Sequence, residues 1–533
     1  MSVHRRRPAE AVRSAGADAL GALFKPLPFL LVDGGDPRLA LESNGKANIY
    51  GCRPHPTPRT LAFSSSTATA ISERAYRRAE LARDELLADS IELGVFDAFD
   101  RRMDLLRQSL RDCLELSDAE IVFSPSGTDT QLQALFFARQ LLGGAVTSIV
   151  VASDQTGSGT AYTSRGQNFS VTTSRGKPVG KGSPIEGLAD SVDSIGISMF
   201  APDGAVRSAG EIDAAVIAAV ERQIRLGRKV VLQAMDSSKL GWRAPSDGCL
   251  RYIGARWPDG VQILVDACQM RIGRARLRAY LQRGYIVLVT GSKFFTGPPF
   301  SGASLFPAAL ASRIAAWSRL PAGISDYATR YDVPRPWSAA REALPAVPNF
   351  GQWLRWEAAL QEMRDYYAVP LVFRRAALAR LTDAVREIIG SSQHLELMGA
   401  RETLEDDIDD EEMSCRTIFP FFVKRGGRAL DLEEMTKLYH ALNRDLSAAM
   451  PEVEHSLASI PCHIGQPVKL PAGAILRIGI GARQLSEAWS ADPQTAEKNI
   501  SAIIEHAAIV VRKIDLIART ALHEAAVPLV RAL

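Results

Sequence analysis

The chain has 533 residues, of which 46% are hydrophobic, 23% charged and 7% aromatic, and these proportions exclude a disordered, collagen-like or disulfide-scaffold protein. The 63 Lys and Arg residues exceed the 60 Asp and Glu residues by only three and are spread along the chain, so no nucleic-acid partner is expected. A chain of this length has room for more than one domain and a large core.

Targeting and redox features favour a cytoplasmic protein. The six cysteines are scattered without paired spacing, which indicates neither a metal site nor a disulfide framework. The apolar stretch 141–153 is too short to span a bilayer, so no membrane partner is expected. The basic start, MSVHRRRPAEAVRSAG, has no apolar segment behind it and does not read as a secretory signal.

The N-terminal part divides into an arm and two helices. Residues 1–70 are rich in Pro, Gly, Ser and Arg and predict an irregular N-terminal arm. From Ser72 to Cys113 the helical period of apolar residues predicts two amphipathic helices.

Seven short apolar runs then alternate with amphipathic stretches, which is the pattern of strands joined by crossover helices. The runs are 120–124, 148–153, 193–200, 229–235, 261–267, 285–291 and 301–307. They predict an α/β fold whose large domain, residues 71–346, holds a mainly parallel seven-stranded sheet flanked by helices. A long helical pattern begins just after residue 347, and 347–533 is predicted as a smaller C-terminal α+β domain.

Three groups of polar residues are predicted at the carboxyl edge of this sheet, where α/β proteins place ligands. Ser126, Gly127 and Thr128 open a helix, which offers free N–H groups to an anion such as phosphate. Asp266 ends one strand, and Lys293 follows another. A lone lysine there is usually a solvated surface residue, but an anion cradle, a carboxylate and a lysine together are what pyridoxal 5′-phosphate (PLP) requires.

At this point the sequence resembles the class V aminotransferase and cysteine desulfurase group of fold-type I PLP-dependent enzymes, from about residue 60 to the C-terminus. Six motifs in the order of that family carry the resemblance: SPSGTDTQ (124–131), QAMDSSKLGWRAPS (233–246), VDACQ (265–269), TGSKFFTGPP (290–299), VPNFGQWLRWEAAL (347–360) and ILRIGIGARQLSE (475–487). The resemblance implies a fold-type I PLP-dependent transferase fold and a homodimer with its active site near the subunit interface.

The resemblance also implies roles for individual residues. Lys293 would form the Schiff base and serve as general base, Asp266 would pair with the pyridine nitrogen, and Gln269 would approach the ring hydroxyl. Arg477 would clamp the substrate carboxylate. Further cofactor contacts are expected from Ser126, Gly127, Thr128, Thr290 and Ser292 at the phosphate, and from Ser238, or Asp236 in its place, near a cofactor oxygen.

The sequence also departs from that family. No histidine lies between residues 56 and 393, although many relatives stack one on the cofactor ring, so Gln155, Thr156 or Tyr162 is expected there instead. Cys462 precedes Arg477 at a spacing similar to that of the persulfide-forming cysteine of one desulfurase branch. A packed, unreactive cysteine is the equally weighted alternative.

The function predicted from these features is a PLP-dependent transferase or lyase acting on an amino acid, or on a molecule with an amino-acid head, in specialised biosynthesis. The additions in the arm and around 165–200 are expected to shape an unusual substrate pocket. A desulfurase-like enzyme using Cys462 is the first alternative. A non-catalytic scaffold with this fold is the second.

Overall fold

The computed structural model describes residues 8–42, 45–399, 401, 408 and 410–520. Its large sheet has the order β2-β8-β7-β6-β5-β3-β4. All seven predicted strands are confirmed, as β2 (Ala119–Ser124), β3 (Val146–Val151), β4 (Val192–Ile197), β5 (Lys229–Met235), β6 (Val261–Asp266), β7 (Ile286–Thr290) and β8 (Gly302–Pro307). Only β8 of these seven runs antiparallel to its neighbours, so the carboxyl ends of β2 to β7 share one edge.

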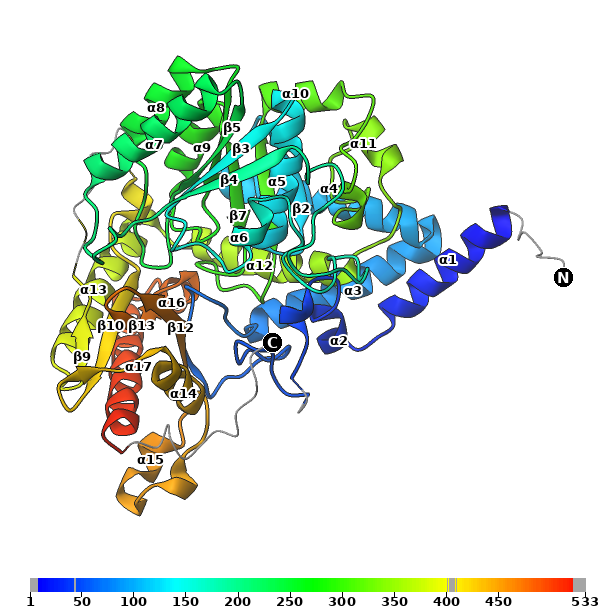
Figure 1. Cartoon of the computed structure of the whole chain (residues 1–533). Helices are drawn as coiled ribbons and strands as arrows, with labels where there is room; N and C mark the ends of the chain where they lie inside the picture. Colours follow the sequence, from blue (N-terminus) through cyan, green and yellow to red (C-terminus); the bar gives the residue numbers. More distant parts are fainter. Residues whose placement is uncertain (1–7, 43–44, 400, 402–407, 409, 521–533) are drawn as a thin grey trace.

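Successive side chains of a strand point to opposite faces of the sheet, and helices pack on both faces. Val122 packs into one apolar cluster, while Ile121 and Phe123 pack into another. Figure 1 shows the helices around this sheet. One face carries α5 (Gly127–Leu142), α10 (Ala308–Ala315) and α11 (Ser338–Ala343), and the other carries α7 (Ala209–Arg225), α8 (Asp247–Arg256) and α9 (Arg274–Gln282).

The N-terminal region is more ordered than predicted. The arm contains α1 (Pro8–Leu23) and α2 (Leu27–Leu31), so the prediction of an irregular arm is wrong for these residues. Leu27, Leu30 and Leu31 are buried, because α2 packs on α12 (Phe350–Ala368). The two predicted helices are confirmed as α3 (Glu73–Leu93), capped by the Ser72 hydroxyl, and α4 (Val95–Leu114).

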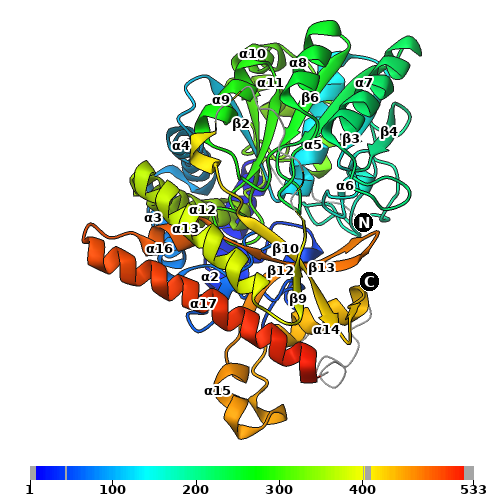
Figure 2. The ribbon, with the colours of Figure 1, turned by 90° about the vertical axis from the view of Figure 1, so that its left-hand side faces the viewer.

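The C-terminal part forms a second sheet, ordered β1-β12-β13-β10-β11 with β9 beside β10. Its strands are β9 (Leu395–Leu397), β10 (Ile418–Arg425), β11 (Arg428–Ala429), β12 (Cys462–Leu470) and β13 (Gly473–Gly479). The arm adds β1 (Leu61–Phe63), which pairs in parallel with β12. Its helices are α13 (Leu371–Gly390), α14 (Leu432–Leu442), α15 (His455–Ala458), α16 (Ala482–Ala488) and α17 (Pro493–Thr520), the long red helix of Figure 2.

Within the described ranges, no helix has the length and apolar character needed to cross a bilayer.

Helix α12 supports the turn that follows β7. A Cβ atom on Gly291 would lie 2.5 Å from the Cβ atom of Ala359, and one on Gly297 would lie 2.6 Å from the same atom. Only glycine permits this approach of a helix to a backbone turn. Lys293 lies between these two glycines, so the packing of α12 determines where its backbone sits.

We predict that Gly297→Ala destabilises the protein by about 1–3 kcal/mol, because the added methyl group overpacks the contact with Ala359. Urea unfolding would measure the change. Gly210→Ala is the matched control, since a Cβ atom at Gly210 on α7 meets nothing within 4 Å. Equal stability of the two variants would contradict this account of the turn.

Candidate active site

A cavity of about 230 Å³ opens at the carboxyl edge of the large sheet and is lined by residues of the arm and of both sheets. Nine of the eleven predicted site residues line it. They are Ser126, Gly127, Thr128, Asp266, Gln269, Thr290, Ser292, Lys293 and Arg477. Residues far apart in the sequence therefore meet in one place.

Lys293 is half-buried, and its amine has no hydrogen-bond or ion-pair partner among the described residues. Burial lowers the pKa of Lys293, and the charges of Arg271 and Arg477 lower it further. Cys268 and Asp266 oppose this shift without cancelling it. A lysine that loses its proton more easily is a better nucleophile toward a carbonyl carbon.

Asp266 is held in place by two donors. Its Oδ2 accepts a hydrogen bond from Gln131 Nε2 at 2.8 Å, and its Oδ1 accepts one from the Cys268 backbone N–H at 3.0 Å. The Thr160 hydroxyl in turn donates to Gln131 Oε1 at 2.7 Å. Sequence reasoning missed Gln131, although it lies one helical turn after Gly127 and so on the same face of α5.

Hydrogen bonds to neighbouring groups orient the side chains of Gln269 and Thr290, two of the predicted site residues. Gln269 Nε2 donates to the Ser66 carbonyl at 3.0 Å, and Gln269 Oε1 accepts from Arg271 at 2.8 Å. The Thr290 hydroxyl donates to the Cys268 carbonyl at 2.6 Å. Each side chain therefore has a defined position at the cavity wall.

The N-terminus of α5 forms the anion-binding end of the cavity. Ser126 caps the helix by accepting the Asp129 N–H at 3.2 Å, and the N–H groups of the first turn have no acceptor within the helix. Arg38 Nη2 lies 3.4 Å from the Ser126 hydroxyl and 3.3 Å from that of Thr128. Asp36 binds the same guanidinium through two hydrogen bonds.

Arg38 is a site residue that sequence reasoning missed. It lies in η1 (Pro37–Leu39) of the arm, far from α5 in the sequence, and no motif marks it. Its guanidinium carbon lies 4.7 Å from the centre of the Phe300 ring and 5.7 Å from that of Phe169. The arm and the 165–200 region therefore meet at the anion-binding end, although only the arm contributes residues to the lining.

Arg477 projects from β13 and is 2% exposed. Its Nη2 donates to the Thr67 hydroxyl and to the Gln466 carbonyl, each at 2.9 Å, and its Nη1 donates to the Lys239 carbonyl at 3.3 Å. Burial lowers the pKa of Arg477 to about 10. A guanidinium held in this way has the geometry to bind a carboxylate.

Buried polar atoms without partners indicate that the cavity is built for a ligand. Neither polar atom of the Gln155 side chain has a partner among the described residues, and the same holds for Ser66 Oγ and Arg477 Nε. Such atoms are rare unless a ligand or water satisfies them. Tyr50 and Phe300 add aromatic rings to the lining, 5.7 Å apart. The donors and rings fit an anionic, ring-bearing cofactor.

Of the three residues expected beside the ring, Gln155 and Thr156 line the cavity and Tyr162 does not.

The structure does not bring Ser238 to the cavity, although the residues on either side of it line the wall. Its hydroxyl accepts the backbone N–H groups of Leu240 and Trp242, at 3.1 and 3.2 Å, and so stabilises its own turn. Asp236, the expected substitute, is buried against Tyr280, whose hydroxyl donates to it at 3.2 Å. The structure therefore places neither side chain at the cavity wall, which Met235, Ser237 and Lys239 of the same segment line instead.

Cys462 is also outside the cavity. Its thiol is fully buried in the apolar core and donates to the Ile460 carbonyl at 3.5 Å. Burial raises the pKa of Cys462 to about 11, the opposite of an activated thiolate. The expectation that Cys462 contributes to substrate binding or sulfur transfer is wrong, and the packed-cysteine alternative describes it.

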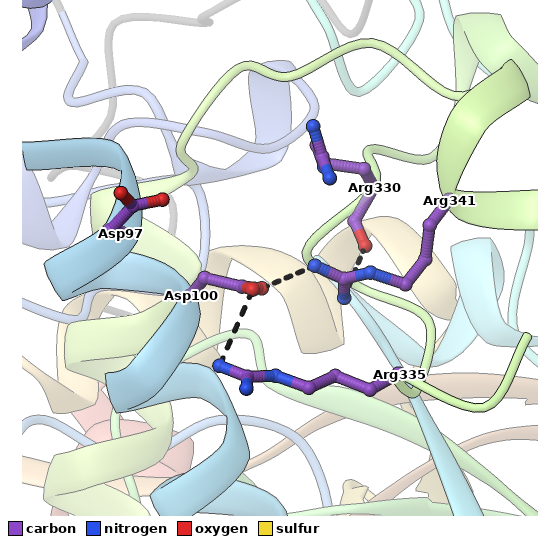
Figure 3. Close-up of a pocket in the computed structure, with 5 residues that line it drawn as sticks. All are labelled: Asp97, Asp100, Arg330, Arg335 and Arg341. Atoms are coloured by element: carbon purple, nitrogen blue, oxygen red, sulfur yellow. Dashed lines mark hydrogen bonds and ion pairs between the residues drawn. The ribbon is translucent and has the colours of Figure 1, made fainter. Parts of the chain in front are cut away.

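A second, more open hollow lies beside α4 and α11 (Figure 3). Asp100 forms ion pairs with Arg341 at 2.5 Å and with Arg335 at 3.4 Å, so these charged residues of the hollow already have partners. None of the predicted site residues lines it.

No protein-family model and no curated protein matches the chain. Among solved structures, mouse CSAD has a TM-score of 0.48 at 14% identity, covering 94% of this chain and 99% of that one. The cystine C-S lyase C-DES has a TM-score of 0.47 at 12% identity, covering 84% and 98%. The cysteine desulfurase CsdA of Escherichia coli has a TM-score of 0.46 at 13% identity, covering 86% and 95%. The functional argument therefore depends on the geometry of the cavity.

The anion-binding end predicts a pH-dependent stability. Burial and the nearby Asp36 raise the pKa of Asp129 to about 7, from an ordinary value of 3.8. Because the folded state holds this proton more tightly than the unfolded chain, stability falls as the pH rises from about 4 to 7. Asp129→Asn should therefore gain about 2 kcal/mol relative to wild type between pH 5 and pH 8.

Urea unfolding without added ligand at the two pH values would measure the gain. Asp190→Asn, at an exposed position, is the control and should show no such change. A constant difference between Asp129→Asn and wild type would contradict a protonated Asp129 in the folded state.

Proposed function

We propose that the protein is a PLP-dependent enzyme that acts at the amino group and Cα of an amino acid, or of a substrate with an amino-acid head. The observation that carries the proposal is the convergence of Lys293, Asp266 and the α5 N-terminus on one cavity. Among the described residues the Lys293 amine has no ion-pair partner, and Asp266 is held in place by Gln131 and the Cys268 N–H. Each of the three is a group that PLP needs.

The cofactor would be held by groups of fixed position. Its phosphate would bind at Ser126, Gly127 and Thr128, with Arg38 supplying positive charge, and its pyridine nitrogen would face Asp266. Thr290 and Ser292 lie in the same wall and add hydroxyl groups. Bound there, the cofactor supplies an electron sink for charge that develops at the substrate Cα.

The chain's own residues would then position the substrate and move its proton. Arg477 would hold the substrate carboxylate, which fixes the orientation of Cα in the cavity. The Lys293 amine, whose pKa burial lowers, would take the proton from Cα. The buried wall keeps water away from this step.

The reaction type is proposed only as transferase or lyase, and the specialised biosynthetic role, the homodimer and the cytoplasmic location stay predictions.

We predict that Lys293→Ala abolishes covalent attachment of PLP at residue 293, because the linkage needs the amine of this side chain. Purified protein would be incubated with PLP, reduced with borohydride and digested, and the peptide containing Lys293 analysed by mass spectrometry. Wild type should carry the cofactor on Lys293. The control Lys469→Ala, at an exposed position on β12, should behave like wild type.

A wild-type protein that retains no PLP at residue 293, while remaining folded, would overturn the proposed function. The non-catalytic scaffold would then take its place.

We further predict that Arg38→Ala weakens PLP binding about tenfold to a hundredfold, because a charge-assisted hydrogen bond to the phosphate is lost. Binding of pyridoxal, which lacks the phosphate, should change little. Equilibrium titrations with both compounds would separate the two effects, with Arg53→Ala at an exposed position of the arm as control. Equal weakening for PLP and pyridoxal would contradict phosphate binding by Arg38.

A further inference from the structure

Lys239 is a second lysine at the cavity wall, and the proposed function does not use it. It lies in the turn after β5 that the Ser238 hydroxyl stabilises through the N–H groups of Leu240 and Trp242. Its side chain is half-buried, and its amine has no hydrogen-bond or ion-pair partner among the described residues. A fixed backbone therefore presents a desolvated cation to the cavity.

Lys239 belongs to the end of the cavity that binds the substrate. Arg477 donates to its carbonyl at 3.3 Å. Besides burial, the charges of Arg477 and Lys293 lower the pKa of Lys239 to about 8, so its amine is still mostly protonated at neutral pH. The carboxylate that opposes this shift is Asp154, but its two oxygens accept hydrogen bonds from the Ser198 hydroxyl and the Met199 N–H.

Lys239 is the one cationic side chain of the described lining to which the proposed function assigns no anion. Among its described residues the cationic side chains are Arg38, Lys239, Lys293 and Arg477, and the anionic one is Asp266. Arg38 is already paired with Asp36, and in the proposed function the covalent linkage accounts for Lys293 and the substrate carboxylate for Arg477. Lys239 remains without an anion in a poorly hydrated site, which is costly unless the substrate supplies one.

We propose that Lys239 determines substrate specificity by binding a second acidic group, so that the substrate is an α-amino acid with an acidic side chain. This inference rests on the proposed function, because Arg477 is taken to hold the first carboxylate. A neutral side chain would leave the Lys239 ammonium unpaired when the substrate displaces water from the cavity.

The test compares acids with amides of the same shape. The PLP-loaded protein would be titrated with L-aspartate and L-asparagine, and with L-glutamate and L-glutamine, following the absorption of the bound cofactor. At least one acid should bind about tenfold or more tightly than its amide. Lys239→Met should reduce that ratio to about one, Lys239→Arg should retain a preference, and Lys469→Met should match wild type.

Equal affinities for acid and amide in wild type, or a preference that persists in Lys239→Met, would overturn the inference. So would a loaded protein that responds to none of the four amino acids, although PLP binding would then still stand. Failure to bind PLP at Lys293 would instead overturn the proposed function. The two failures are thus distinguished by the cofactor absorption before any amino acid is added.

Discussion

The desolvation of one lysine is the constraint on which the site depends. Lys293 loses hydration when it is buried, and the cations around it disfavour its charged form. Its one close carboxylate, Asp266, is already engaged by Gln131 and by the Cys268 N–H. The result is an amine that is easier to deprotonate, carried on a backbone turn whose position is set by the packing of α12 against the glycines on both sides of Lys293.

Three parts of the chain together enclose the cavity that holds Lys293. The large sheet contributes Asp266 and Lys293, the small sheet contributes Arg477, and the arm contributes Arg38 and Tyr50. Arg271 joins them, since its guanidinium donates to Gln269, to Ser65 of the arm and to Thr417 of the small domain. Burial at this junction lowers the pKa of Arg271 to about 9.

The parts of this arrangement that could be predicted were those with local causes. The central strands β5, β6 and β7 are largely apolar runs, because both of their faces are buried, and each run reads as a strand by itself. Asp266 and Lys293 follow such strands directly, so their position at the edge followed from the strands. Ser126 precedes a helix, where a hydroxyl has a defined capping role.

The parts that failed depend on contacts that sequence spacing does not encode. The Ser238 turn closes on its own hydroxyl, so side chains alternate between the cavity and the interior, and a one-residue difference exchanges Ser238 for Lys239. Cys462 pairs opposite Leu61 of the arm, a partner some 400 residues away in sequence, and is buried by that pairing. Arg38 likewise reaches α5 only through the arm's tertiary packing.

The charges at the two ends of the cavity are compensated differently. At the α5 end, Asp36 accepts two hydrogen bonds from Arg38, so the guanidinium has a counter-ion before any ligand binds. A phosphate bound there would share Arg38 with the Asp36 carboxylate. Asp129, buried beside them, can accept a proton when the negative charge increases. At the Arg477 end no carboxylate of the described residues binds a lining cation as Asp36 binds Arg38, and Asp154 accepts hydrogen bonds from Ser198 and Met199 instead. In the proposed function the substrate supplies negative charge at this end, and the proposed selectivity for acidic side chains rests on that asymmetry.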